Sequence, residues 1–167
     1  MRHAGKYMAY FMVIVFSLMG VQGLLAHCQI PCGIYGDDMR FKMIEEHIAT
    51  IEKSMKQITE LSRENRVNYN QLVRWITNKD DHANYIQEIV DKYFLTQRVK
   101  PVDPQNKEEY QGYLQKLELL HQMLFYAMKT KQTTDLAHVE KLRELLSKFH
   151  QAYFGAEESK HLEEHHR

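Results

Sequence analysis

Cysteine, proline and glycine are all scarce in this sequence. Of 167 residues, two are Cys, three are Pro and seven are Gly. A single Cys pair cannot supply the dense disulfide framework on which many small secreted proteins depend. Because Pro and Gly are the strongest breakers of regular structure, their scarcity leaves long stretches free to form helices. The composition therefore favours an all-α protein without a disulfide scaffold.

The chain also lacks an excess of charge of either sign. It has 22 Lys and Arg against 22 Asp and Glu. This balance argues against nucleic-acid binding driven by phosphate neutralisation, so no nucleic-acid partner is expected. The length suits about one domain, and the 44% hydrophobic content is ordinary for a globular protein.

Residues 1–26 have the parts of a cleaved leader of the signal-peptide type. Arg2 and Lys6 give a positive start, and a largely apolar run follows from Met8 to Met19. Ala26 is a plausible residue at the cleavage point. The alternative is a membrane anchor, but the run is shorter than the roughly 20 apolar residues that a span needs. We expect a processing protease to remove the leader and the mature chain, 27–167, to have no membrane attachment.

Both cysteines lie in the nine residues that follow the leader, His27 to Tyr35. Cleavage after Ala26 would place a free α-amine, an imidazole and a thiol on adjacent positions at His27 and Cys28. Thiolates and nitrogen donors in tetragonal geometry favour nickel or copper. A structural zinc site would normally need a second ligand pair downstream, and the chain has no second Cys pair. The segment therefore predicts a soft metal site built mostly from its own atoms.

The motif His-Cys-x-x-Pro-Cys-Gly-x-Tyr after a leader resembles the nickel hook of the nickel-containing superoxide dismutases. All six of its fixed positions are present: His27, Cys28, Pro31, Cys32, Gly33 and Tyr35. The resemblance implies a superoxide dismutase, an oxidoreductase that converts superoxide to dioxygen and hydrogen peroxide by Ni(III)/Ni(II) cycling. It also implies one nickel ion per chain and a homohexamer of four-helix bundles.

The resemblance also implies a role for each residue of the hook. The metal ligands would be the Cys28 and Cys32 thiolates, the His27 α-amine and the Cys28 backbone nitrogen. The His27 imidazole would add an axial ligand in the oxidised state. Tyr35 would line the approach to the metal rather than bind it. The catalytic residues implied are therefore His27, Cys28, Cys32 and Tyr35.

Two other functions remain open at this point. The first is an exported metal-binding bundle that uses the same hook without turnover. The second is a structural protein stapled by a Cys28–Cys32 disulfide. The leader indicates export to the periplasm or outside the cell. The alternative is a cytoplasmic enzyme whose pro-segment is cut inside the cell, which would keep the thiols reduced.

The remainder of the chain predicts a helical bundle over about 38–155, followed by a polar tail at 156–167. Asp37 and Asp38 are expected to cap a first helix that starts near Met39. A second helix should run from Tyr69 to Leu95, with a polar interruption at 78–81. A third is expected from Lys107 to Lys129. A fourth follows a cap at Thr134 or Asp135 and stops at Gly155. Four amphipathic helices with short connections make a four-helix bundle.

Apolar periodicity predicts which side of each helix faces the core. The first stripe is Ile44, Ile48, Ile51, Met55 and Ile58, and the second is Leu72, Val73, Ile76, Ile86, Ile89, Val90 and Tyr93. The third is Tyr110, Leu114, Leu117, Leu120 or His121, Leu124 and Met128, and the fourth is Leu136, Val139, Leu142, Leu146, Phe149 and Tyr153. Further apolar residues exceed these stripes and indicate either an oligomer interface or a wider core: Tyr110, Tyr113, Leu119, Phe125, Tyr126 and Phe154.

Overall fold

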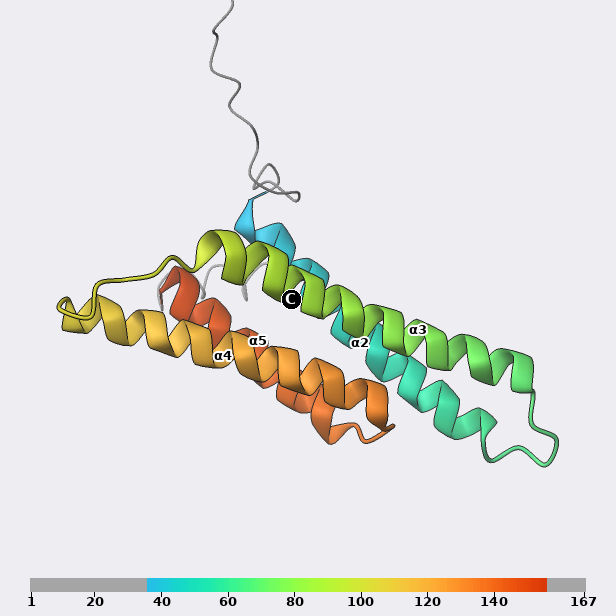
Figure 1. Cartoon of the computed structure of the whole chain (residues 1–167). Helices are drawn as coiled ribbons and strands as arrows, with labels where there is room; N and C mark the ends of the chain where they lie inside the picture. Colours follow the sequence, from blue (N-terminus) through green and yellow to red (C-terminus); the bar gives the residue numbers. More distant parts are fainter. Residues whose placement is uncertain (1–35, 156–167) are drawn as a thin grey trace, which may run out of the picture. The chain divides into compact units, whose positions relative to one another are not determined.

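The computed structural model describes residues 36–155, and this part of the chain is helical with no strand (Figure 1). The elements are α2 (Asp37–Leu61), α3 (Tyr69–Glu88), η2 (Ile89–Arg98), α4 (Lys107–Gln132) and α5 (Ala137–Phe154). The predicted all-α four-helix bundle is confirmed. The leader at 1–26, the hook at 27–35 and the tail at 156–167 lie outside the described residues. None of the helices in 36–155 is long and apolar enough to cross a membrane.

The bundle consists of two antiparallel helix pairs. α2 packs along α3, and α4 packs along α5, with α3 against α4 and α2 against α5. Figure 1 shows the α2–α3 pair beside the α4–α5 pair, with the 62–68 turn reaching beyond the turn that joins α4 to α5. Short connections force neighbouring helices to run antiparallel, which is the usual topology of such bundles.

The core is one continuous apolar cluster to which every element contributes. The predicted stripe on α2 is confirmed, since Ile44, Ile48, Ile51, Met55 and Ile58 are all buried. An aromatic group closes one end of the core: Phe41 stacks on Phe149 with ring centroids 5.3 Å apart, and Phe94 meets both rings edge-on. Such arrangements add stabilisation beyond the burial of area.

Three predicted core stripes need correction. On α3, Val73 and Ile76 are 60% and 40% exposed. They lie on the part of the α2–α3 pair that has no further helix to cover it. On α4, the buried side chains are Leu119, Leu120, Met123, Ala127 and Thr130, so of the predicted stripe only Leu120 is fully buried, and Leu114 is exposed. On α5, Leu136 is exposed, while Leu145, which was not predicted, is buried.

The apolar residues beyond the predicted stripes were expected either at an oligomer interface or in a wider core. Leu119 is buried, and Tyr113, Tyr126 and Phe154 pack partly against the core. Phe125, in contrast, is 45% exposed. A wider core therefore accounts for most of this set but not for Phe125.

The predicted helix ends are correct to within a few residues, but one cap is wrong. α2 begins at Asp37 with Gly36 as its N-cap residue, and no side chain caps it. Gly36 has φ 73°, a left-handed conformation that glycine adopts at little cost. Asp135 accepts a hydrogen bond from the Ala137 N–H at 3.0 Å, as expected of a cap for α5. Gly155 ends α5 with φ 91°, as predicted.

The last ten residues of the second helical region form a π-helix, which the apolar periodicity did not predict. Its characteristic spacing appears in the Val99 N–H, which donates to the Phe94 carbonyl oxygen five residues earlier at 2.8 Å. π-helices usually occur as single turns and are frequent at functional sites. Because a π-helix has more residues per turn than an α-helix, residues five apart in η2 lie on the same side of it. This spacing determines which side chains of η2 meet near the start of α2.

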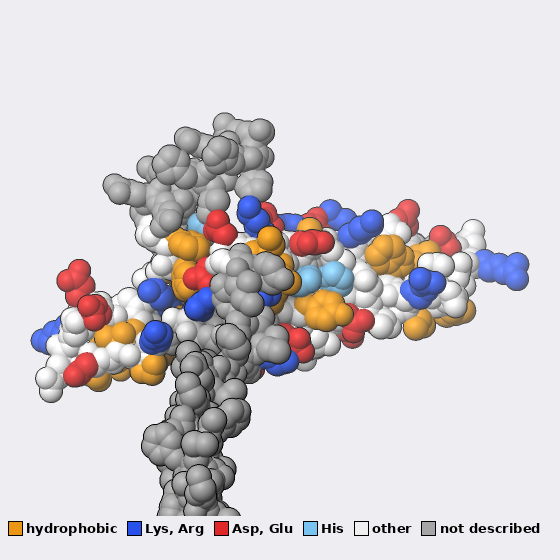
Figure 2. Space-filling model, turned by 90° about the horizontal axis from the view of Figure 1, so that it is seen from above, with side chains coloured by type: hydrophobic (Ala, Val, Ile, Leu, Met, Phe, Trp, Pro, Cys, Tyr) orange, Lys and Arg blue, Asp and Glu red, His pale blue; other side chains and the backbone are white. Residues whose placement is uncertain are grey.

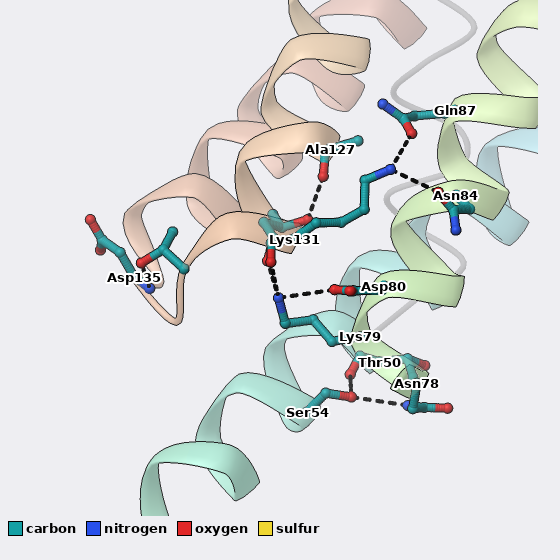
Figure 3. A network of polar contacts seen from close by, with 12 residues as sticks. Thr50, Ser54, Asn78, Lys79, Asp80, Asn84, Gln87, Ala127, Lys131 and Asp135 are labelled. Atoms are coloured by element: carbon teal, nitrogen blue, oxygen red, sulfur yellow. Dashed lines mark hydrogen bonds and ion pairs between the residues drawn. The ribbon is translucent and has the colours of Figure 1, made fainter. Parts of the chain in front are cut away.

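A buried lysine joins the two helix pairs (Figure 3). Lys79 of α3 is only 3% exposed, and its Nζ donates to the carbonyl oxygens of Thr130 and Lys131 at 2.7 Å each. These carbonyls belong to the last turn of α4, where the helix leaves them without partners and the helix dipole is negative. Asp80 lies 3.1 Å from the same nitrogen. The predicted polar interruption at 78–81 is therefore continuous helix whose lysine faces inward.

Further polar contacts connect α3 to α4 and to α2 in the same region. Lys131 of α4 reaches back to α3, where its Nζ donates to Asn84 Oδ1 at 2.7 Å and to Gln87 Oε1 at 2.8 Å. On α2, Ser54 Oγ accepts a hydrogen bond from Asn78 Nδ2 at 2.9 Å. Polar contacts thus fix the register of α3 against both of its neighbours.

Replacing the buried cation should destabilise the bundle. In Lys79→Met the two α4 carbonyls lose charge-assisted hydrogen bonds, so the free energy of unfolding should fall by about 2–3 kcal/mol. Urea denaturation measures this change. Lys148→Met is the matched control, because Lys148 is exposed and pairs with Glu144 within the described helices. It should change stability by less than about 0.5 kcal/mol. Equal stabilities for the two variants would contradict the role given to Lys79.

Candidate metal centre

The predicted site residues His27, Cys28, Cys32 and Tyr35 all lie outside the described residues. What the structure describes is the point at which the hook joins the bundle. Only Gly36 separates Tyr35 from Asp37, the first residue of α2. Two residues span at most about 7 Å of chain. The surroundings of Asp37 therefore determine where the C-terminal end of the hook is attached.

The Asp37 carboxylate binds three side chains from two other elements. Its Oδ1 accepts a hydrogen bond from the Tyr93 hydroxyl of η2 and lies 3.0 Å from Arg98 Nε, also of η2. Its Oδ2 accepts a hydrogen bond from the Tyr153 hydroxyl of α5 at 2.7 Å. We call Asp37, Tyr93, Arg98 and Tyr153 the anchor network. It ties the start of α2 to the ends of two other helices.

The π-helix explains how one carboxylate can reach both groups of η2. Tyr93 and Arg98 are five residues apart, and the wider turn brings them to the same side, where Arg98 donates from a terminal guanidinium nitrogen to the Tyr93 hydroxyl at 2.9 Å. Two guanidinium groups also contact the Tyr93 ring. The carbon of Arg98 lies 4.8 Å from the ring centroid, and that of Arg40, in the first turns of α2, lies 5.0 Å from it. Such cation–π contacts are favourable when the groups are shielded from water.

The charges of the network support one another. Burial alone would raise the pKa of Asp37, but the hydrogen bonds from Tyr93 and Tyr153 and the positive charge of Arg98 outweigh it, and the net pKa is lowered. Burial and the hydrogen bond to Asp37 raise the pKa of Tyr153 and that of Tyr93. The carboxylate is thus held ionised, and both phenols are held protonated as donors.

The described part of the chain offers no competing centre with three donors. No group of three or more His, Cys, Asp or Glu side chains that could hold a metal occurs within 36–155. Both thiols of the chain belong to the hook, at Cys28 and Cys32. Thiolates are the soft donors that bind nickel strongly, and nitrogen donors beside them complete a suitable set. The donor chemistry of residues 27–32 therefore fits nickel.

A comparison with protein families decides the affiliation. The family model for nickel-containing superoxide dismutase matches residues 22–157, a range that includes the whole hook and all the described helices. The chain belongs to the nickel-containing superoxide dismutase family. No curated protein and no solved structure matches it. Nickel superoxide dismutases are oxidoreductases, so nickel is the cofactor and superoxide the substrate.

Sequence reasoning missed the anchor network of this nickel superoxide dismutase. Asp37 was expected only as a helix cap, and Tyr93 and Tyr153 only as apolar packing residues. Arg98 was not singled out, because its five-residue spacing from Tyr93 corresponds to neither helical nor strand periodicity. The one available signal was the pair of polar groups on otherwise apolar positions, the hydroxyls of Tyr93 and Tyr153, since buried hydroxyls usually have a partner.

Asp37→Asn should make the enzyme less stable at neutral pH. Because the folded-state pKa of Asp37 lies below the ordinary 3.8, the carboxylate stabilises the fold fully above that value and progressively less as pH falls through the lowered pKa. Loss of its charged hydrogen bonds should cost about 1–3 kcal/mol at pH 7. The difference from the wild type should shrink toward pH 3, as urea unfolding at both pH values would measure.

Asp38→Asn is the control for this prediction. It removes a carboxylate from the same first turn of α2 but leaves the anchor network intact, so its effect at pH 7 should remain within about 0.5 kcal/mol. A stability difference between wild type and Asp37→Asn that did not change with pH would contradict the account.

Proposed function

We propose that the hook at 27–35 is the catalytic site and that it becomes competent when a protease removes residues 1–26. The observation that supports this is the full set of six fixed positions, within a stretch that the family model covers. The Cys28 and Cys32 thiolates, the His27 α-amine and the Cys28 backbone nitrogen would hold one nickel ion per chain. The His27 imidazole would supply a further ligand in the oxidised state.

The chemistry follows from these donors. When bound by these residues, nickel would supply one-electron Ni(III)/Ni(II) chemistry, by which two superoxide anions and two protons would yield dioxygen and hydrogen peroxide. The thiolates and the deprotonated amide donate the electron density that makes the higher oxidation state accessible. Tyr35 would line the approach to the metal and order solvent there. A free amine at His27 is essential, because a blocked amine cannot bind the metal.

The anchor network acts as a positioning device in this proposal. A hook that supplies most of its own ligands has a fixed geometry only if its C-terminal end is fixed. Asp37 provides such an attachment, two residues after Tyr35, through its bonds to Tyr93, Arg98 and Tyr153. Sites held by well-packed supporting groups are more accurate than sites on free segments.

We further propose that the enzyme is a homo-oligomer, a hexamer by resemblance to its family. Tyr69, Val73 and Ile76 lie on α3 and are 72%, 60% and 40% exposed, and Phe125 on α4 is 45% exposed. Exposed apolar groups of this size on one helix are typical of interaction surfaces. Light scattering of the purified enzyme should give a mass of several chains. A mass of one chain at micromolar concentration would contradict this proposal.

The leader supports export, with cytoplasmic maturation as the alternative. Export would expose Cys28 and Cys32 to oxidation before nickel arrives, and a reducing compartment would not. Recovery of the nickel-loaded mature chain from a periplasmic or extracellular fraction would support export. Recovery from the cytoplasm alone would contradict it.

Variants of the hook test the catalytic proposal. Cys28→Ser and Cys32→Ser should abolish superoxide turnover, because a protonated hydroxyl cannot replace a thiolate donor. His27→Gln should retain nickel, since the amine remains, but lose at least about tenfold in turnover, as expected when a ligand that acts in one oxidation state is missing. Turnover is measured by direct decay of superoxide, and nickel content by mass spectrometry.

His121→Gln is the control variant, because His121 is an exposed histidine on α4 and should be silent. Full turnover in either serine variant would exclude the proposed site. Nickel binding without turnover in the wild type would support a metal-binding bundle instead.

A further inference from the structure

Two histidines that the hook chemistry does not use face each other between α2 and α3. The Nδ1 atoms of His47 and His82 are 3.0 Å apart, although 35 residues separate them in the sequence. Their rings are nearly perpendicular, at 74°, with centroids 4.9 Å apart. Both side chains are half-buried, so they are held by the helices and still reach solvent. Figure 2 shows histidine side chains at the surface beside hydrophobic ones.

This spacing is that of two neighbouring ligands on one metal ion. Imidazole nitrogens bind zinc at about 2.0–2.1 Å, so two of them at an angle of about 90–110° lie roughly 2.9–3.4 Å apart. The observed 3.0 Å falls within that range without movement of either helix. A ring centroid lies about 1.1 Å beyond its nitrogen, so the centroids of such a pair are roughly 4.5–5.2 Å apart. The observed 4.9 Å agrees.

Tyr85 covers the pair on one side, and an open pocket borders His47. Tyr85 packs against both rings, with centroids 5.3 Å from His47 and 5.6 Å from His82, and covers one side of the pair. His47 and Tyr85 also line an open pocket of about 340 Å³ between α2 and the α3–η2 segment. His82 does not line this pocket, so the pocket opens the His47 side of the pair to solvent.

Metal binding requires neutral imidazole, and the surroundings of His47 favour that form. Burial and the neighbouring His82 lower the pKa of His47, while Glu46 acts in the opposite direction. Around the pocket, Arg40 and Lys92 bring positive charge and Glu88 negative charge. The lowered pKa favours the neutral form of His47, the form in which an imidazole can act as a ligand.

We propose that His47 and His82 bind a second divalent transition-metal ion through their Nδ1 atoms, independently of the hook. Imidazole pairs suit zinc, nickel and copper, and exclude magnesium and calcium, which prefer oxygen ligands. No third His, Cys, Asp or Glu within 36–155 joins the pair in a metal-binding group. Residues 36–155 thus supply two ligands and water the rest, so the ion exchanges readily, unlike one held by a closed four-ligand site.

The alternative is a simple hydrogen bond between the rings. A neutral imidazole carries its proton on one nitrogen, so two facing Nδ1 atoms can bond directly only if one ring is protonated at Nδ1 and the other is not. A shared metal requires both rings to carry their proton on Nε2 instead. The two cases therefore differ in a measurable property of the wild-type chain.

Zinc binding to the nickel-loaded full-length mature enzyme tests the proposal. The tail histidines His161, His165 and His166 are changed to Gln in every sample, so that they do not contribute. Equilibrium dialysis against Zn²⁺ should give one additional ion per chain. His47→Gln and His82→Gln should each weaken its binding at least tenfold, whereas His121→Gln should change it less than twofold. Equal zinc binding in all variants would mean an adventitious ion only and would overturn the proposal.

A second measurement needs no substitution at the pair. In nitrogen-15 spectra of the histidine side chains, zinc should move the Nδ1 resonances of two histidines together and leave both rings protonated at Nε2. Spectra in which zinc leaves every histidine unchanged would overturn the proposal even if the variants at 47 and 82 failed to fold. Because hook nickel and superoxide turnover are monitored in the same sample, failure of this site is distinguishable from failure of the hook.

Discussion

The attachment of Asp37 is the constraint on which the proposed nickel hook depends. A metal site made from nine consecutive residues has no scaffold of its own, so its rigidity must come from its point of entry into the bundle. Asp37 lies at that point, and its carboxylate binds hydroxyls from η2 and α5 as well as the Arg98 guanidinium. Three helix ends therefore meet at one ionised group. These bonds more than offset the cost of desolvating the carboxylate. The lowered pKa of Asp37 reflects this net stabilisation of the ionised form.

Two unusual features make this junction possible. The π-helix brings Tyr93 and Arg98 to one side of η2, and a regular α-helix would separate them around the axis. At a separate point in the same bundle, Lys79 fixes α3 against the last turn of α4. Both features carry a cost, since a π-helix is rare and a buried ammonium is desolvated. Polar contacts between helices that are far apart in the sequence offset both costs. These contacts fix the positions of the helices around the point at which the hook is attached.

Much of the fold could be predicted from the sequence, because long amphipathic segments and few breakers leave little choice other than a bundle. The α2 stripe and most helix ends were correct for that reason. The predicted buried side of α4 was wrong. Apolar residues occur nearly all the way around this helix, so only its packing against the other helices selects the buried side. Val73 and Ile76 were wrongly predicted to be buried, because apolar periodicity does not reveal where a helix extends beyond the helices packed against it. The hook residues His27, Cys28, Cys32 and Tyr35 stay a prediction from motif chemistry. The contacts of Asp37, Arg98 and the His47–His82 pair are long-range and leave no local pattern.

The central claim is that a hook beginning at a free His27 amine holds nickel on a bundle that anchors it at Asp37. Native mass spectrometry of the enzyme purified from its own host tests this most directly. The account predicts chains that begin at His27, reduced at Cys28 and Cys32, with one nickel retained per chain by the hook. Chains that keep residues before His27, or that begin there with a Cys28–Cys32 disulfide and no nickel, would contradict it.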